Sequence, residues 1–243
     1  MNILIPMAGL GSRFAKAGYE KPKPFIDVAG KPMISRVMEN LHVYGARFIL
    51  VAQREHLKKE AGLVKDLLDK YDVRFVSIDG VTEGTACTVL VAQEYINNDT
   101  PLLIANADQI VDMDIADFIK DAQERNLDGS ILCFRDDNRD PKWSFAKTDM
   151  NDLVTQVKEK EAISDMATTG IYYFATGLSF VESANRMIEV DDRVNGEFYT
   201  CPTYNYMIDK NLRIGVYELP ESSMHGIGTP NDLNNYLNSY FSN

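Results

Sequence analysis

Residues 2–14 read Asn2-Ile3-Leu4-Ile5-Pro6-Met7-Ala8-Gly9-Leu10-Gly11-Ser12-Arg13-Phe14, and this stretch decides how the rest of the chain is interpreted. The apolar run Asn2–Pro6 predicts a buried strand, and two glycines follow it. Because glycine lacks a Cβ, such a segment turns tightly and brings backbone N–H groups close to a ligand, where they can cradle phosphate oxygens. The stretch predicts a strand that ends in an anion-binding loop, with an ordinary turn as the alternative.

Nearby basic residues favour the anion-binding interpretation. Arg13 has a forked guanidinium suited to phosphate, and Lys23 stands between Pro22 and Pro24, which restrict its backbone. The pattern GxxxxGK[ST] is absent, and GxGxxG fails because position 14 is Phe. These mismatches exclude a P-loop kinase and a dinucleotide-dependent dehydrogenase.

Beyond this loop, strand-like and helical patterns alternate through the first half of the chain. This order predicts an α/β fold with a mostly parallel sheet covered by helices. We expect strands at Asn2–Pro6, Arg47–Gln53, Arg74–Ile78 and Pro101–Ala105, with helices at Met33–Val43, His56–Lys70, Gly84–Tyr95 and Ile115–Glu124.

The second half is richer in strands, and it could extend the same sheet in antiparallel fashion. We expect strands at Ser130–Phe134, Trp143–Lys147, Leu153–Val157 and Gly170–Phe174, and a helix near Leu178–Glu189. No Pro/Gly/Ser linker or internal repeat separates the halves. We therefore expect a single domain over residues 1–243.

Composition excludes several classes of protein. The 243 residues are 45% hydrophobic and 25% charged, as in ordinary globular proteins and unlike disordered or collagen-like chains. The net charge of −11 argues against a nucleic-acid or membrane partner. The longest uncharged stretch, residues 166–181, is too short and glycine-interrupted to span a membrane. Three cysteines without CxxC spacing are expected to be buried thiols. We expect a cytoplasmic protein.

Several motifs, in a fixed order, resemble one enzyme family. They are Ala8–Arg13, Pro22–Phe25, Gly30–Ile34, Glu83–Ala86, Asn106–Gln109, Lys158–Lys160, Thr169–Phe174 and Gly228–Leu233. Together they resemble the nucleotidyltransferases that include the sugar-1-phosphate nucleotidylyltransferases, or pyrophosphorylases. The resemblance extends over nearly the whole chain.

The resemblance implies a doubly wound, Rossmann-like, mostly parallel mixed sheet with helices on both faces, in which residues of about 1–125 bind an NTP and those of about 126–243 bind an acceptor. It places Arg13 and Lys23 at the NTP phosphates as catalytic groups, and it makes Asp108 a catalytic Mg²⁺ ligand. The residues expected to contact the NTP are Ala8, Gly9, Leu10, Gly11, Ser12, Asp79, Gly84 and Thr85. Independently, Asp108 follows a parallel strand, whose carboxyl end opens onto the ligand crevice of such sheets.

Two acidic or charged clusters have competing interpretations. Asp112 and Asp114 show the DxD spacing of a metal site, but Asp114 precedes a helical pattern and is better explained as an N-cap. The resemblance makes Glu159 and Lys160 acceptor contacts, with Lys160 meeting the acceptor phosphate, whereas the alternative is a solvated charge run. Glu197 and Asn205 are two further acceptor-binding candidates on the same ground.

The chain departs from the family pattern at one position. Many relatives carry a second magnesium aspartate where this chain has Gly226, so a two-carboxylate metal site is in doubt. His225 stands beside it and could touch phosphate, although a lone loop histidine is more often structural or solvent-facing.

The reaction implied is transfer of NMP from an NTP, with CTP, UTP or dTTP favoured, to a phosphorylated small molecule, with Mg²⁺ present and pyrophosphate released. The default acceptor is a sugar 1-phosphate, in the supply of precursors for cell-surface polysaccharide. The absent aspartate also fits a short branch of cytidylyltransferases acting on non-sugar phosphates of the phosphoglutamine or phosphocholine type, in capsule modification. Alternatives of another class are a nucleotide-sugar-dependent glycosyltransferase and a non-catalytic nucleotide-binding module. A homodimer is left open.

Overall fold

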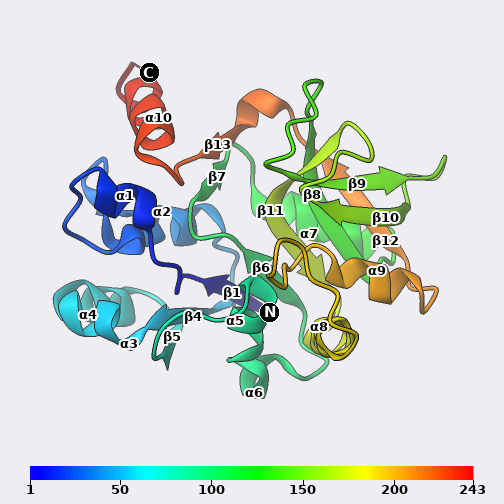
Figure 1. The fold of residues 1–243 in the computed structure, drawn as a ribbon, viewed down its shortest axis with the longest axis horizontal. Coiled ribbons are helices and arrows are strands. Elements are labelled where there is room, and N and C mark those ends of the chain that lie inside the picture. The colour runs from blue at the N-terminus through cyan, green and yellow to red at the C-terminus, as the bar shows by residue number, and fades with distance from the viewer. Residues whose placement is uncertain (243) are drawn as a thin grey trace.

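The computed structural model describes residues 1–242, and within them one mixed sheet of nine strands runs through the molecule (Figure 1). Seven strands follow the order β10-β9-β11-β6-β1-β4-β5, while β8 pairs with β11 and β12 with β8. The strands are β1 (Asn2–Pro6), β4 (Arg47–Gln53), β5 (Val73–Ile78), β6 (Leu102–Ala105), β8 (Gly129–Arg135), β9 (Ser144–Thr148), β10 (Val154–Glu159), β11 (Met166–Phe174) and β12 (Ile214–Glu218). Short pairs β2 (Asp27–Val28) with β3 (Lys31–Pro32), and β7 (Gln109–Val111) with β13 (Met224–Gly226), lie outside it.

Strands β1, β4 and β6 form a parallel core that is buried on both faces, and the less buried β5 extends it at the edge of the sheet. Strand β1 runs parallel to both β4 and β6, and β4 runs parallel to β5. Ile3 and Ile5 point into one hydrophobic core and Leu4 into another, and all three side chains are fully buried. A continuous apolar run such as Ile3-Leu4-Ile5 is what a strand with two covered faces requires.

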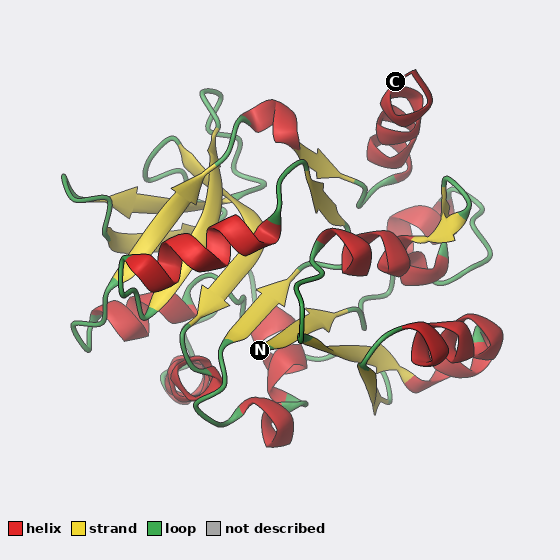
Figure 2. Cartoon of the chain, turned by 180° about the vertical axis from the view of Figure 1, so that it is seen from behind, coloured by secondary structure: helices red, strands yellow, loops and turns green. Residues whose placement is uncertain are grey.

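Helices cover both faces of the sheet, which confirms the expected α/β architecture (Figure 2). One core contains side chains of α2 (Met33–Asn40), α4 (Ala61–Lys70) and α7 (Ile115–Glu124). The other contains side chains of α5 (Thr85–Leu90), α8 (Gly177–Glu189) and α9 (Thr203–Ile208). The remaining helices are α1 (Ser12–Lys16), α3 (Arg54–Lys59), α6 (Gln93–Ile96), α10 (Pro230–Ser242) and the 3₁₀ turns η1 (Lys23–Phe25) and η2 (Glu221–Ser223).

The second half joins the same sheet in antiparallel fashion, as expected. Strand β11 pairs antiparallel with β6 on one side and with β8 on the other. Strand β12 returns parallel to β8 and was not expected from the sequence. Tyr204 of α9 fixes this half, because its buried hydroxyl donates to the backbone carbonyls of Ser130 and Tyr173.

Two expected helices are each divided in the structure. The helix expected over His56–Lys70 breaks at Glu60, whose backbone leaves the helical region (φ −110°, ψ 35°). The helix expected over Gly84–Tyr95 ends at Leu90 and resumes at Gln93. Apolar residues keep a helical spacing on both sides of each break, so periodicity alone does not reveal a single non-helical residue.

The parallel strands bring the expected site residues to one edge of the sheet. Strand β1 ends at Pro6 and continues into the glycine loop, and β6 ends at Ala105, three residues before Asp108. Because parallel neighbours end at the same edge, the loop and Asp108 meet there. Two of the cysteines, Cys133 and Cys201, are buried as expected, and Cys87 is half-buried. In residues 1–242 we find no helix with the length and apolar character needed to cross a bilayer.

Candidate active site

The glycine loop after β1 is held in place by the neighbouring strand and by Lys23. The buried Gln53 side chain donates to the carbonyl of Ala8 at 2.7 Å. Gly11 adopts a left-handed conformation (φ +59°), and a Cβ there would lie 2.8 Å from the Cβ of Lys23. Any other residue at position 11 would therefore be strained and would displace Lys23. Gln53 was missed by the sequence analysis, since a polar residue at a strand end carries no distinctive signal.

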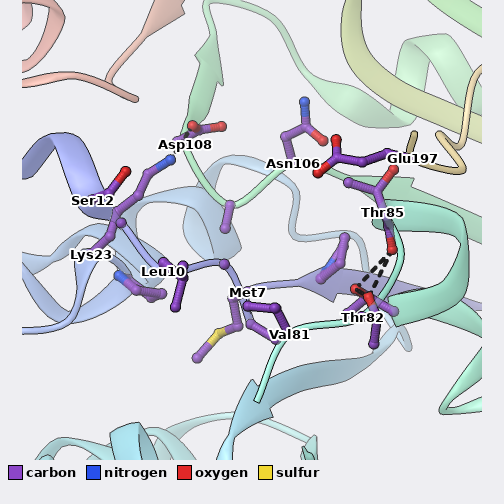
Figure 3. Close-up of a pocket in the computed structure, with 18 residues that line it drawn as sticks. Met7, Leu10, Ser12, Lys23, Val81, Thr82, Thr85, Asn106, Asp108 and Glu197 are labelled. Atoms are coloured by element: carbon purple, nitrogen blue, oxygen red, sulfur yellow. Dashed lines mark hydrogen bonds and ion pairs between the residues drawn. The ribbon is translucent and has the colours of Figure 1, made fainter. Parts of the chain in front are cut away.

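Lys23 and Asp108 form an ion pair beside a cavity. Figure 3 shows the Lys23 side chain pointing toward the Asp108 carboxylate. The two side chains come from η1 and from the β6–β7 turn, and each is 23% exposed. The Asp108 carbonyl accepts a hydrogen bond from the Ile227 backbone at 2.8 Å. A Cβ at Gly228 would lie 2.4 Å from the Asp108 carboxylate, so the missing side chain leaves room for it.

The cavity of about 490 Å³ that opens beside this pair gathers most of the residues expected to bind an NTP, and we name it the nucleotide cavity. Of the expected residues, it is lined by Ala8, Gly9, Leu10, Gly11, Ser12, Lys23, Gly84, Thr85 and Asp108, and also by Glu197. Thr82 and Thr88, which the sequence analysis did not select, complete its far wall and hydrogen-bond to each other at 2.6 Å. A loop, two strand ends and a helix start thus converge on one space of a size suited to a nucleotide.

The wall that carries Thr85 depends on a glycine. Gly84 has φ +131°, and a Cβ there would lie 2.3 Å from the carbonyl oxygen of Phe198. The backbones of Glu83 and Ala86 hydrogen-bond to Phe198 on either side of this contact, at 2.8 and 3.0 Å. The segment around Phe198 is therefore fixed to the wall of the nucleotide cavity.

We expect Gly84→Ala to lower the free energy of unfolding by about 1–3 kcal/mol, because both the φ angle and the contact with Phe198 exclude a Cβ. Urea denaturation would measure this change, and NTP affinity should fall with it because Thr85 moves. Gly62→Ala in α4 is the matched control, because a Cβ there meets nothing within 4 Å. Equal stability of the two variants would contradict the role given to Gly84.

Two residues expected at the NTP lie elsewhere. Asp79 is 76% exposed and pairs with Arg54 at 2.8 Å, and this hydrogen bond lowers the pKa of its carboxyl group. In the described chain Asp79 does not line the nucleotide cavity, and its contact with the NTP stays a prediction. Arg13 instead lines an adjoining cavity that shares Asn106 and Asp108 with the first.

The expected acceptor residues Glu159 and Lys160 line a smaller cavity of about 240 Å³, which we name the acceptor pocket. The Glu159 carboxylate accepts a hydrogen bond from Ser144, and burial raises the pKa of its carboxyl group. The Lys160 ammonium donates to the hydroxyl of Tyr199 and lies 4.4 Å from the centroid of its ring. A solvated charge run would not bury one carboxylate and hold the neighbouring ammonium against an aromatic ring.

Glu197 connects the two cavities, whereas Asn205 does not reach either. The Tyr199 hydroxyl that accepts from Lys160 donates to the Glu197 carboxylate, and Glu197 lines the nucleotide cavity. Both polar atoms of the Asn205 amide bond the backbone of Val157, at 2.9 and 3.0 Å. These two hydrogen bonds fix α9 against β10, and in the described chain Asn205 lines neither cavity, so its contact with an acceptor stays a prediction.

Polar and aromatic residues beyond the site residues selected from the sequence also line the acceptor pocket. Asn106 and Gln109 hydrogen-bond to each other at 3.2 Å, and Lys142 and Trp143 lie on the loop before β9. A Cβ at Gly170 would lie 2.3 Å from the Asn106 amide, so within the motif Thr169–Phe174 this glycine contributes space, and Tyr172 lines the pocket with its side chain. The only available sequence signal was the position of Asn106 and Gln109 around Asp108.

The second acidic pair is not arranged as a metal site. The Asp114 carboxylate accepts from the Ala116 backbone at 2.9 Å, which confirms it as the N-cap of α7. Asp112 instead lies 2.6 Å from Nε2 of His225. Across residues 1–242 no group of three His, Cys, Asp or Glu side chains is arranged to hold a metal.

The donor set around Asp108 fits a magnesium ion that keeps most of its water. Asp108 offers one carboxylate at an open cavity, and Gly226 beside it leaves free space, because a Cβ there would meet nothing within 4 Å. Mg²⁺ is commonly held by one or two carboxylates with waters and substrate phosphates. Asp108 together with NTP phosphates would satisfy that preference.

Comparison with known proteins agrees with this geometry. The chain is 28% identical over 134 residues to a mannose-1-phosphate guanyltransferase of Yarrowia lipolytica, covering 54% of this chain and 37% of the relative. It is 26% identical to a UTP–glucose-1-phosphate uridylyltransferase of Haloferax volcanii, covering 76% and 78%. The chain spans 37% of the length of the Yarrowia protein and 49% of that of a Dictyostelium discoideum relative, which is about half of each or less.

Solved structures show the same fold. A nucleoside-diphosphate-sugar pyrophosphorylase from Vibrio cholerae superimposes with a TM-score of 0.82 at 25% identity, covering 97% of this chain and 99% of that one. A UDP-glucose pyrophosphorylase bound to UDP-glucose, 17% identical, gives 0.81, covering 99% and 98%, and shows likeness of fold alone. Residues 3–206 match the model of the family described as Nucleotidyl transferase. With this match and the shared architecture, the chain belongs to the nucleotidyl transferase family of enzymes.

Proposed function

We propose that this chain transfers NMP from an NTP to a phosphorylated small molecule and releases pyrophosphate, with a sugar 1-phosphate as the default acceptor. The observation that carries the proposal is the Lys23–Asp108 pair, which stands beside the nucleotide cavity. Asn106 lines both this cavity and the acceptor pocket, so the two spaces adjoin. We further propose that residues 1–243 act as one domain in the cytoplasm, where NTPs are available. Its product would serve as an activated precursor for cell-surface polysaccharide.

The chain's own residues would act by alignment and by neutralising charge. The acceptor phosphate attacks the α-phosphorus and needs no dedicated base, because a phosphomonoester with a second pKa near about 6 is mostly dianionic at neutral pH. The backbone of Gly9–Gly11 and the Lys23 ammonium would hold the NTP phosphates, and Lys160 would hold the acceptor. Positive groups placed where charge develops lower the barrier most.

Magnesium is the proposed cofactor, held by Asp108 and by phosphate oxygens. Bound there, it would neutralise phosphate charge and polarise the reacting phosphoryl group. The ion pair with Lys23 keeps the Asp108 carboxylate beside the nucleotide cavity, and the Lys23 ammonium stands where it could also meet NTP phosphates.

A second acceptor class is favoured by one observation. The acceptor pocket is small and combines the buried Glu159 carboxylate with the aromatic side chains of Trp143, Tyr172 and Tyr199. Such a site also suits a non-sugar phosphate that carries an ammonium group, as the cytidylyltransferase alternative requires.

The direct test measures pyrophosphate release for four NTPs against a panel of phosphorylated acceptors. The panel holds sugar 1-phosphates, amino sugar phosphates, phosphocholine and phosphoglutamine. Mg²⁺-dependent release with one pair is the expected result. Cleavage of a nucleotide sugar without pyrophosphate release would instead identify a glycosyltransferase, and NTP binding with no turnover would identify a non-catalytic module.

Substitutions of Lys160 and Glu159 are expected to have different kinetic effects. Lys160→Ala should raise KM for every acceptor that works, because the phosphate is the group they share. Glu159→Gln should cost most for an acceptor with an ammonium group and less for one with a neutral hydroxyl. Steady-state kinetics across the panel would measure both, with Lys158→Ala from the same charge run as the control. If all three variants match the native enzyme, the acceptor-site assignment is wrong.

A further inference from the structure

A cavity next to the nucleotide cavity has no role in the proposal so far. It shares Asn106 and Asp108 with the nucleotide cavity, and its other walls come from the turn around Gly226, from α10 and from the loop before β9. We name it the distal cavity. Lys142 lines both this cavity and the acceptor pocket, so its side chain stands where the two spaces meet.

Charged groups of both signs face the distal cavity. Arg13 and Lys142 are its two permanent cations, and a third basic group, His225, lies 2.6 Å from the Asp112 carboxylate. Of its two carboxylates, Asp108 is already paired with Lys23, and Asp232 accepts a hydrogen bond from Thr229 at 2.7 Å. The wall at Gly226 is empty, because a Cβ there would meet no atom within 4 Å.

Lys142 is held in position by an anchored loop. The Asp136 carboxylate accepts from the backbones of Asn138 and Asp140, at 3.1 and 2.7 Å, and the ring of Trp143 packs edge-on against Phe134. The Lys142 ammonium lies 4.8 Å from the Trp143 ring centroid and pairs with Asp140 at 3.1 Å. Both partners of this pair are more than 40% exposed, so the ammonium can exchange Asp140 for a ligand at small cost.

We propose that Lys142 joins Arg13, which the family resemblance already places at the NTP phosphates, in binding the pyrophosphate portion of the NTP, and the pyrophosphate product, in the distal cavity. This inference rests on the proposed function. A bond forms between an acceptor phosphate oxygen and the α-phosphorus, the bond from the α-phosphorus to the β-phosphate oxygen breaks, and the electron pair leaves with pyrophosphate. Lys142 and Arg13 stabilise that charge with side-chain cations in a region where Gly226 offers no carboxylate for a second metal ion.

Pyrophosphate binding tests the site independently of turnover. Calorimetry with inorganic pyrophosphate in EDTA should show binding to the native protein, weakened about tenfold in Lys142→Ala by loss of one charge-assisted contact. Lys142→Arg should retain it, and so should Lys147→Ala, the matched control on β9, which in the described structure lines neither cavity. No binding to the native protein without metal, or equal affinity in Lys142→Ala, would overturn the proposal.

Turnover with the best NTP and acceptor shows whether the loss of Lys142 affects catalysis or acceptor binding. It also distinguishes a failure of the pyrophosphate site from a failure of the proposed function. Lys142→Ala should lower kcat by about 10²-fold while leaving KM for the acceptor nearly unchanged. Gly226→Asp, placed in the Lys142→Ala background, should recover part of kcat as Mg²⁺ rises, because a second carboxylate then lines the cavity that Asp108 also lines. A raised acceptor KM with native pyrophosphate affinity would move Lys142 to the acceptor. Absence of turnover by the native enzyme would overturn the proposed function and not the pyrophosphate site.

Discussion

Asp108→Asn is expected to lower turnover by about a thousandfold, the equivalent of several kcal/mol of lost transition-state stabilisation. The change removes the charge that would hold magnesium but keeps the size and polarity of the side chain. It also leaves the ammonium of Lys23 without the carboxylate that it pairs with in this structure. The backbone contact of Asp108 with Ile227 and the close packing of Gly228 do not depend on the charge. The fold should therefore be retained.

Pyrophosphate release over a range of Mg²⁺ concentrations would measure this loss, and circular dichroism would check the fold. Asp114→Asn is the matched control, because it makes the same chemical change nearby in an N-cap where asparagine serves as well as aspartate. The control should keep native rates and a native Tm. Native rates in Asp108→Asn would overturn its assignment as the metal ligand.

Lys23→Ala is expected to lower kcat by about 10²- to 10³-fold, with a smaller effect on acceptor binding. The ammonium lies at the edge of the nucleotide cavity, where it would meet charge that grows as the bond to pyrophosphate breaks. A group that acts mainly on the transition state changes kcat more than KM. Lys23→Met should give the same loss while keeping the apolar stem that packs on Gly11.

Steady-state kinetics separate this role from simple charge loss. Lys21→Ala is the control, since Lys21 belongs to the same proline-rich segment but is exposed and, within the part of the chain described, lies outside the nucleotide cavity. It should leave kcat unchanged. An unchanged kcat with a raised acceptor KM in Lys23→Ala would place Lys23 on the acceptor instead of the NTP.

The sequence predicted the elements whose signals are local. The apolar run at Ile3-Leu4-Ile5 requires a strand that is buried on both faces, and the glycines that follow require a tight loop. Asp114 before an amphipathic helical pattern was enough to predict an N-cap, which the structure confirms. The resemblance to the nucleotidyltransferases also rests on short local motifs, such as Ala8–Arg13 and Asn106–Gln109. The homodimer and the roles of individual site residues remain predictions.

Some residues that resembled the family pattern are placed differently by the fold. Asp79 follows β5, where a contact with the nucleotide was expected, but Arg54 holds it at the surface. Asn205 was expected at the acceptor, but Val157 takes both atoms of its amide. In both cases the competing partner lies 25 or more residues away in sequence. No local pattern could reveal it.

By itself the sequence determined the parallel core, the glycine loop and the position of Asp108, because strand alternation, glycine freedom and the end of a strand are properties of neighbouring residues. Only the tertiary structure decided which side chains meet. The pairing of Lys23 with Asp108 spans 85 positions, and Lys142 reaches two cavities because the β11–β6 pairing carries the second half of the sheet against the first. Such contacts depend on the packing of the whole sheet, which no short stretch of the chain encodes.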